Sequence, residues 1–251
     1  MLCATLAMTA SPGSAHMPYM LPSVFDAGTR TSVTIEASFT EDAFRPEIAM
    51  QNAPFERTGP DGATVRLGTP ALTHDATMLD VPLPADGLYR ISSGQRIGRM
   101  GKMVREGDSW KVVGEGMTPV GAAPVDVRST TLADVYVLHG KPGACGALKP
   151  RGVALEIHPL SDPASYAPGK PARFEILYDG KPLATEKVTL FRERGFYDGR
   201  KQETTATPDA SGQFMVTPTD AGRYLMLVRH RVGPDAMVAT SYTVTLAFEA
   251  M

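Results

Sequence analysis

The chemically most promising residue of this chain is a histidine that export would place at its N-terminus. Residues 1–15 carry no charged side chain and end in Gly13-Ser14-Ala15, the small-x-small pattern that a signal peptidase cuts. Cleavage after Ala15 makes His16 the first residue of the mature chain. Its α-amine and its imidazole can then chelate one ion together, and such a nitrogen pair suits Cu(II) or Ni(II).

Methionine and histidine side chains supply the candidate partners of His16. Met17 and Met20 follow it directly, and thioether sulfur favours Cu(I). A site that includes either methionine leans towards copper, whereas nitrogen and oxygen donors alone lean towards nickel or cobalt. Among the internal histidines, His74 in a polar loop ranks before His139 at the end of a strand. The predicted metal ligands are therefore His16, Met17, Met20, His74 and His139.

Other classes of function find little support in the sequence. There is no nucleophile elbow, paired-histidine helix motif, Walker loop or dinucleotide fingerprint, so we do not expect an enzyme. The 25 Lys and Arg residues nearly balance the 27 Asp and Glu residues without forming a basic stripe, which disfavours nucleic acid as a partner. No stretch approaches the roughly 20 apolar residues of a membrane span. Cys145 lies in a turn-rich stretch and is interpreted as incidental.

Alternating hydrophobic residues predict β-strands along most of the chain. Val33, Ile35, Ala37 and Phe39 share one face of an expected strand, and residues 242–248 repeat the pattern. The 24 Gly and 21 Pro residues suit many tight turns between short strands. The sequence therefore predicts an all-β fold.

Two similar segments suggest that this fold occurs twice. An acidic residue, a glycine and then a tyrosine open an apolar strand at Tyr89 and again at Tyr224. In immunoglobulin-like sandwiches such a tyrosine bonds back across a corner. We therefore expect two tandem immunoglobulin-like or transthyretin-like β-sandwich domains. The predicted divisions are a signal peptide over 1–15, an N-terminal sandwich over 16–125, a linker and connecting strand over 126–150, and a C-terminal sandwich over 151–251.

Several motifs together resemble a bacterial domain family of unknown function. They are Ala15-His16 followed by Pro22, Asp179-Gly180-Lys181-Pro182-Leu183 leading to Val188-Thr189-Leu190, Gly212-x-Phe214, and Ala221-Gly222-Arg223-Tyr224-Leu225. Members of that family are often labelled periplasmic components of cobalt or nickel transport, or a nickel uptake transporter family. The resemblance implies export, two sandwiches and a link to metal uptake.

Three functions follow from these residues. The first is a periplasmic accessory protein that binds nickel, cobalt or copper through His16 and serves an envelope transporter. The second is a non-catalytic adaptor that binds a protein or glycan partner, for which the basic and aromatic stretch from Phe191 to Lys201 is the candidate surface. The third is a copper-dependent oxidative enzyme built on the terminal histidine. We favour the first function.

Overall fold

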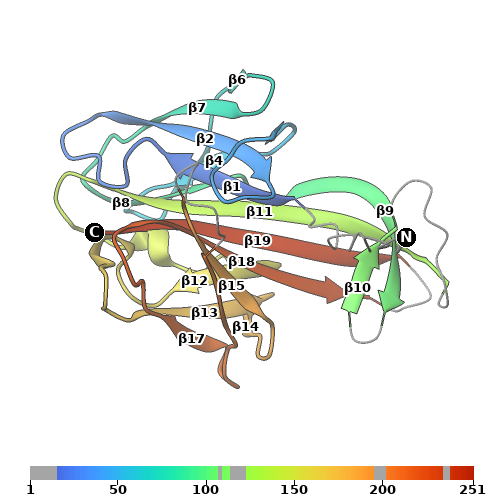
Figure 1. Ribbon diagram of the computed structural model, residues 1–251. Helices are drawn as coiled ribbons and strands as arrows, with labels where there is room; N and C mark the ends of the chain where they lie inside the picture. Colours follow the sequence, from blue (N-terminus) through green and yellow to red (C-terminus); the bar gives the residue numbers. More distant parts are fainter. Residues whose placement is uncertain (1–15, 107–108, 114–122, 195–201, 234–237) are drawn as a thin grey trace, which may run out of the picture.

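The computed structural model describes residues 16–106, 109–113, 123–194, 202–233 and 238–251, and their strands form three stacked sheets (Figure 1). The first, the N-terminal sheet, is antiparallel and begins almost at His16. Its path is β1-β2-β7-β6, and β3 also pairs with β2. The bounds are β1 (Met17–Pro22), β2 (Ser32–Thr40), β3 (Ile48–Ala49), β6 (Ala71–Leu72) and β7 (Thr77–Pro82).

The second sheet lies in the middle and draws strands from both halves of the sequence. Its path is β16-β15-β18-β19-β11-β8-β4-β5, with β9 paired to β11 and β10 paired to β9. The bounds are β4 (Glu56–Thr58), β5 (Thr64–Arg66), β8 (Gly87–Ser92), β9 (Arg96–Glu106), β10 (Ser109–Val112), β11 (Val125–His139), β15 (Val188–Arg192), β16 (Gln202–Ala206), β18 (Gly222–Val232) and β19 (Ala239–Ala250).

The third, the C-terminal sheet, covers the other face of the central sheet. In it β13 pairs with β12 on one side and with β14 and β17 on the other. The bounds are β12 (Leu155–Pro159), β13 (Ala172–Tyr178), β14 (Lys181–Pro182) and β17 (Gln213–Val216), and two 3₁₀ turns, η1 (Gly146–Leu148) and η2 (Pro163–Ser165), lie in the connections. The predicted all-β sandwich fold is confirmed.

Strand alternation explains why the central sheet is apolar on both faces. Successive side chains of a strand point to opposite faces. In β11, Val135 and Val137 pack into the core beneath the N-terminal sheet, whereas Leu132 and Tyr136 pack into the core of the C-terminal sheet. The molecule is thus two sandwiches that share their middle layer.

β11 joins the two halves of the chain. It pairs antiparallel with β8 and β9, which precede it in sequence, and parallel with β19 from the C-terminal end. The connecting strand expected between 126 and 150 therefore lies inside a sheet that continues across both expected domains. The division into separate domains over residues 16–125 and 151–251 stays a prediction.

Both predicted tyrosine corners are present. The Tyr89 hydroxyl donates to the carbonyl of Ala85 at 2.7 Å and accepts from the backbone N–H of the same residue at 2.8 Å. The Tyr224 hydroxyl donates to the carbonyl of Asp220 at 2.8 Å. Each bond fixes the turn that precedes a central-sheet strand, as the repeated sequence motif predicted.

Candidate functional site

β1 fixes the position of His16 at one end of the N-terminal sheet. Met17, the next residue, pairs with Thr40 at the end of β2, and the pairing continues to the end of β1. The carbonyl of Pro18 also accepts a bond of 2.7 Å from the buried Thr245 hydroxyl of β19. His16 therefore projects from a strand that is held by two sheets.

The free edge of β1 is closed to further pairing. Ser23 donates its N–H to the carbonyl of Thr34 of β2. In an antiparallel pair the backbone groups of alternate residues point to the partner strand, so the odd-numbered residues of β1 bond to β2 and the even-numbered ones face the outer edge. Pro18 and Pro22 belong to the second set and have no N–H to donate. Such prolines discourage the addition of a further strand along this edge.

The His16 imidazole contacts a carboxylate from the loop between β2 and β3. Its Nε2 lies 3.1 Å from Oε2 of Glu47, and both side chains are somewhat more than one-third exposed. Glu47 is itself held, because its Oε1 accepts the N–H of Glu41 at 3.0 Å and its own N–H donates to the carbonyl of Phe39 at 3.2 Å. The carboxylate is thus positioned by the backbone around it.

The 3.1 Å contact is an ion-pair distance, and a hydrogen bond along it would select one tautomer of His16. A carboxylate is an acceptor, so in such a bond Nε2 carries the hydrogen. With the hydrogen on Nε2, the neutral ring keeps its lone pair on Nδ1. Nδ1 is the ring nitrogen nearer to the backbone of its own residue, and it is the nitrogen that an N-terminal chelate uses.

Met17 and Met20 do not share the exposed position of His16. Met17 is 2 % exposed and Met20 is fully buried, and both belong to the core between the N-terminal and central sheets. Each fills space between packed side chains, which is the commonest role of methionine. Neither thioether is presented at the surface beside the imidazole.

Beneath the loop that carries Glu47 lies a second polar contact. The buried Tyr19 hydroxyl donates to a carboxylate oxygen of Glu36, and the Tyr19 ring packs edge-on against Phe44 with centroids 5.6 Å apart. Burial, followed by the bond to Glu36, raises the pKa of the Tyr19 phenol above its ordinary range. Tyr19 therefore stays protonated as a donor to Glu36 of β2, and its ring supports the loop through Phe44.

His74 lies at the same end of the N-terminal sheet as His16. It is exposed in the turn between β6 and β7, where the hydroxyl of Thr73 donates to the carbonyl of Ala76 at 2.8 Å. The carbonyl of the next residue, Asp75, accepts from Ser38, the β2 residue paired with Tyr19. Within the described ranges, no group of three or more His, Cys, Asp or Glu side chains is arranged to hold a metal ion.

His139 lies beyond the opposite end of β1 from His16. It is the last residue of β11, six residues beyond Ala133. Ala133 pairs with Thr245, whose hydroxyl bonds to Pro18, so Ala133 marks the level of β1 along the sheet. At the rise of a strand this separates His139 from the level of Pro18 by roughly 20 Å. Its Nδ1 contacts the carbonyl of Ala85 at 2.8 Å. His139 therefore fixes the turn before β8 and is not placed with His16.

Two further sequence features have no place in this site. Cys145 is an exposed free thiol before η1, and its Sγ contacts the carbonyl of Gly143 at 3.4 Å. The basic and aromatic stretch from Phe191 to Lys201 begins in β15, but residues 195–201 lie outside the described residues.

Glu47 is the site residue that the sequence did not reveal. It lies 31 positions from His16 in a polar loop with two other acidic residues, and nothing in its local pattern distinguishes it. Only the return of the chain through β2 and β3 brings it to the imidazole.

A family model describes most of this sequence. It matches residues 13–232 and bears the description "Domain of unknown function (DUF4198)". The chain belongs to this family. The matched range begins just before the Ala15-His16 step, so it contains His16 and Glu47. The family description assigns no metal and no transport role.

Comparisons with known proteins add little beyond the family. No curated protein matches the sequence. Among solved structures, the D0-D1 domain of intimin is 13 % identical, with 90 % of this chain and 96 % of that chain covered and a TM-score of 0.23. A Yersinia pseudotuberculosis adhesin, InvE, is 12 % identical with coverages of 92 % and 58 % and a TM-score of 0.21. A two-domain fibronectin type-III segment of chicken tenascin is 11 % identical, with coverages of 94 % and 100 % and a TM-score of 0.23.

TM-scores this low do not indicate a common arrangement of strands, so these proteins carry no inference about function. The described part of the chain contains no helix long and apolar enough to cross a membrane.

Proposed function

We propose that this chain is a non-catalytic, periplasmic accessory protein that binds a transition-metal ion through His16. The proposal requires that the chain be cut after Ala15, which frees the α-amine of His16. The amine and Nδ1 then close a chelate on the ion.

The contact between His16 and Glu47 is the observation that supports the proposal most strongly. A histidine that binds a metal usually donates its other ring N–H to a carboxylate or carbonyl, which fixes the tautomer and makes the ligating nitrogen more basic. The carboxylate of Glu47 lies 3.1 Å from Nε2, close enough to accept that N–H when the ring turns towards it. It acts as the partner that orients the ligand, while the amine and Nδ1 hold the ion.

The available donors bear on the choice of metal. An amine and an imidazole are nitrogen donors, and among divalent ions such sites bind Cu(II) most tightly, followed by Ni(II) and then Co(II). Burial of Met17 and Met20 removes the thioethers that would favour Cu(I). We therefore expect a preference for Cu(II), with Ni(II) as the next candidate.

The small number of ligands suits a protein that hands its ion on. His16 supplies two donors, and the other coordination positions are left for water or for a residue of a receiving protein. A partner such as an envelope transporter would complete the coordination as it takes the ion.

Substitution of Glu47 tests the tautomer argument. Changing Glu47 to leucine removes the acceptor for Nε2–H, and we expect the affinity of the matured protein for Cu(II) to fall by about 10- to 100-fold. Glu47→Gln keeps an acceptor oxygen and should retain most of the affinity. Isothermal titration with Cu(II) against a competing chelator measures both changes.

A second histidine–carboxylate pair provides the matched control. His230 belongs to β18, away from the N-terminus, and its Nδ1 lies 2.7 Å from Oε1 of Glu186. Glu186→Leu should leave Cu(II) affinity unchanged. If Glu47→Leu and Glu186→Leu have equal effects, Glu47 has no special role and the adaptor function takes precedence. Oxygen consumption by the copper-loaded protein with a reductant would favour the oxidative enzyme instead.

A further inference from the structure

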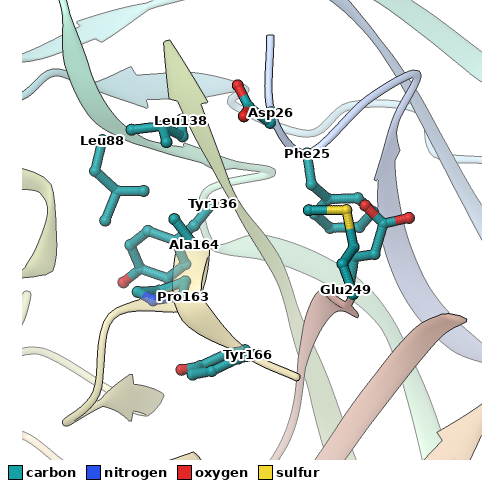
Figure 2. Close-up of a pocket in the computed structure, with 10 residues that line it drawn as sticks. Phe25, Asp26, Leu88, Tyr136, Leu138, Pro163, Ala164, Tyr166 and Glu249 are labelled. Atoms are coloured by element: carbon teal, nitrogen blue, oxygen red, sulfur yellow. The ribbon is translucent and has the colours of Figure 1, made fainter. Parts of the chain in front are cut away.

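The central sheet is split at one end, and the split opens a pocket. β19 pairs with β11 only as far as the Val135–Ala247 step. Beyond it, the segment after β1 takes the place beside β11, because Leu138 donates to the carbonyl of Phe25 and accepts from the N–H of Ala27. The end of β19 no longer pairs with β11 here, and a pocket lined by residues of both strands and of their neighbours lies at this end of the sheet (Figure 2).

The pocket has an apolar, aromatic lining and a small volume. Its walls include Leu88 of β8, Tyr136 of β11, Phe25, and Tyr166 just after η2. The volume is about 40 Å³, whereas a single water molecule needs about 10–15 Å³ on the same measure. The space suits a short aliphatic chain with a compact head and is too small for a cofactor.

Two carboxylates belong to the same lining, Asp26 and Glu249 (Figure 2). Oδ1 of Asp26 accepts the N–H of Gly28 at 2.8 Å, which holds the side chain in place. No hydrogen bond or ion pair reaches the carboxylate of Glu249 from the described residues. Arg223 lies opposite Glu249 on β18, and its Nη1 contacts Glu193 at 3.3 Å.

The surroundings of Glu249 disfavour its charged form, because burial and the neighbouring Glu193 both raise its pKa. Partial burial raises the pKa of its carboxyl, and Arg223 only partly opposes this shift. A partly buried carboxylate without a hydrogen-bond partner, beside an apolar pocket, is a candidate for binding a ligand.

We propose that this pocket binds an alkylammonium group. Its methylenes would pack against Leu88 and the aromatic rings, and its ammonium head would pair with Glu249 and Asp26. Aromatic faces add attraction for such a cation. A lysine side chain of a partner protein and a free alkylamine share this chemistry.

The pocket is independent of the proposed metal site. It lies beside Leu138, next to His139 and at the far end of β1 from His16. Occupation of the pocket therefore does not depend on the amine of His16, and either proposal can fail alone.

Titration of the full chain with n-butylammonium chloride, followed by NMR, tests the proposal. We expect saturable shifts in the resonances of Phe25, Tyr136 and Tyr166. Glu249→Gln should weaken binding at least about 10-fold, or 1.4 kcal/mol. Asp26→Asn provides a second variant in case the first disturbs the fold. Asp80→Asn, an exposed carboxylate on β7, should change binding less than about 2-fold.

A second probe distinguishes the two sources of the cation. If the tripeptide acetyl-Gly-Lys-Gly-amide binds at least about 10-fold more tightly than n-butylammonium, the pocket takes a lysine of a polypeptide. If the two bind equally, it takes a free amine, and either result supports the proposal. Equal binding of uncharged butan-1-ol, undiminished binding to both Glu249→Gln and Asp26→Asn, or no saturable binding would overturn it.

Discussion

Replacing Asp134 with alanine is expected to lower the free energy of unfolding by about 3–5 kcal/mol. Asp134 is 3 % exposed, and its two oxygens accept Nη1 and Nη2 of Arg151 at 2.7 Å each. Burial opposes the charged form of Arg151, but the attraction and hydrogen bonds of Asp134 outweigh it and hold the pKa of the guanidinium above its ordinary value. The substitution removes the two short bonds and leaves the buried charge with a longer contact to Glu56, 3.9 Å from its Nε.

This pair anchors the start of the C-terminal sheet to the central sheet. Asp134 belongs to β11, whereas Arg151 lies four residues before the start of β12 and donates its backbone N–H to the Glu156 side chain at 2.9 Å. Urea unfolding with an unchanged m-value measures the loss of stability.

Two controls separate the buried charge from other effects. Lys102 and Asp126 form an exposed pair at 2.8 Å, so Asp126→Ala should cost less than about 1 kcal/mol. The double variant Asp134→Leu with Arg151→Met removes both charges and should recover much of the loss. A double variant as unstable as Asp134→Ala alone would contradict this account of the pair.

Phe174→Ala is the second substitution with a large expected effect, about 3–5 kcal/mol. The ring is fully buried in the core of the C-terminal sandwich. Its centroid lies 5.5 Å from that of Tyr166, 5.6 Å from that of Phe214 and 6.1 Å from that of Phe248. Removal of the ring takes away apolar burial and leaves a cavity among three other rings.

Phe174→Leu is the matched control, because it keeps most of the apolar volume and should cost less than half as much as alanine. Met215→Ala, on the exposed side of β17, should be nearly neutral, since that side chain is 62 % exposed. Thermal and urea unfolding measure the stability changes of both control variants. A Phe174→Ala variant within about 1 kcal/mol of the parent would mean that this core is not closely packed.

Strand positions were readable from the sequence because alternation is a local property. The apolar positions of residues 33–39 lie in β2, and the repeated tyrosine motif correctly predicted bonds across two turns. β1 gave no such pattern, since its six residues are MPYMLP and five of them are buried. Its prolines obscured the strand and also protect its edge.

The stacking of the layers was not readable in the same way. That β11 and β19 lie side by side depends on pairing between residues more than 100 positions apart, which no local pattern encodes. Glu47 could not be predicted for the same reason, because its contact with His16 depends on distant strand pairing. Met17 and Met20 are buried in the core, although their place beside the terminus suggested that they lie at the surface. Glu249 could have been noticed as unusual, because it is a charged residue near the end of an otherwise buried segment of β19.

The measurement that tests the central claim most directly compares two forms of the protein in a Cu(II) titration. One form begins at His16, as confirmed by intact mass, and the other carries a single additional alanine before it. The account predicts tight binding by the first form and a loss of at least about 100-fold, or 2.7 kcal/mol, in the second. Equal affinity in the two forms, or export of a protein that is not cut after Ala15, would contradict a metal site at the terminal histidine.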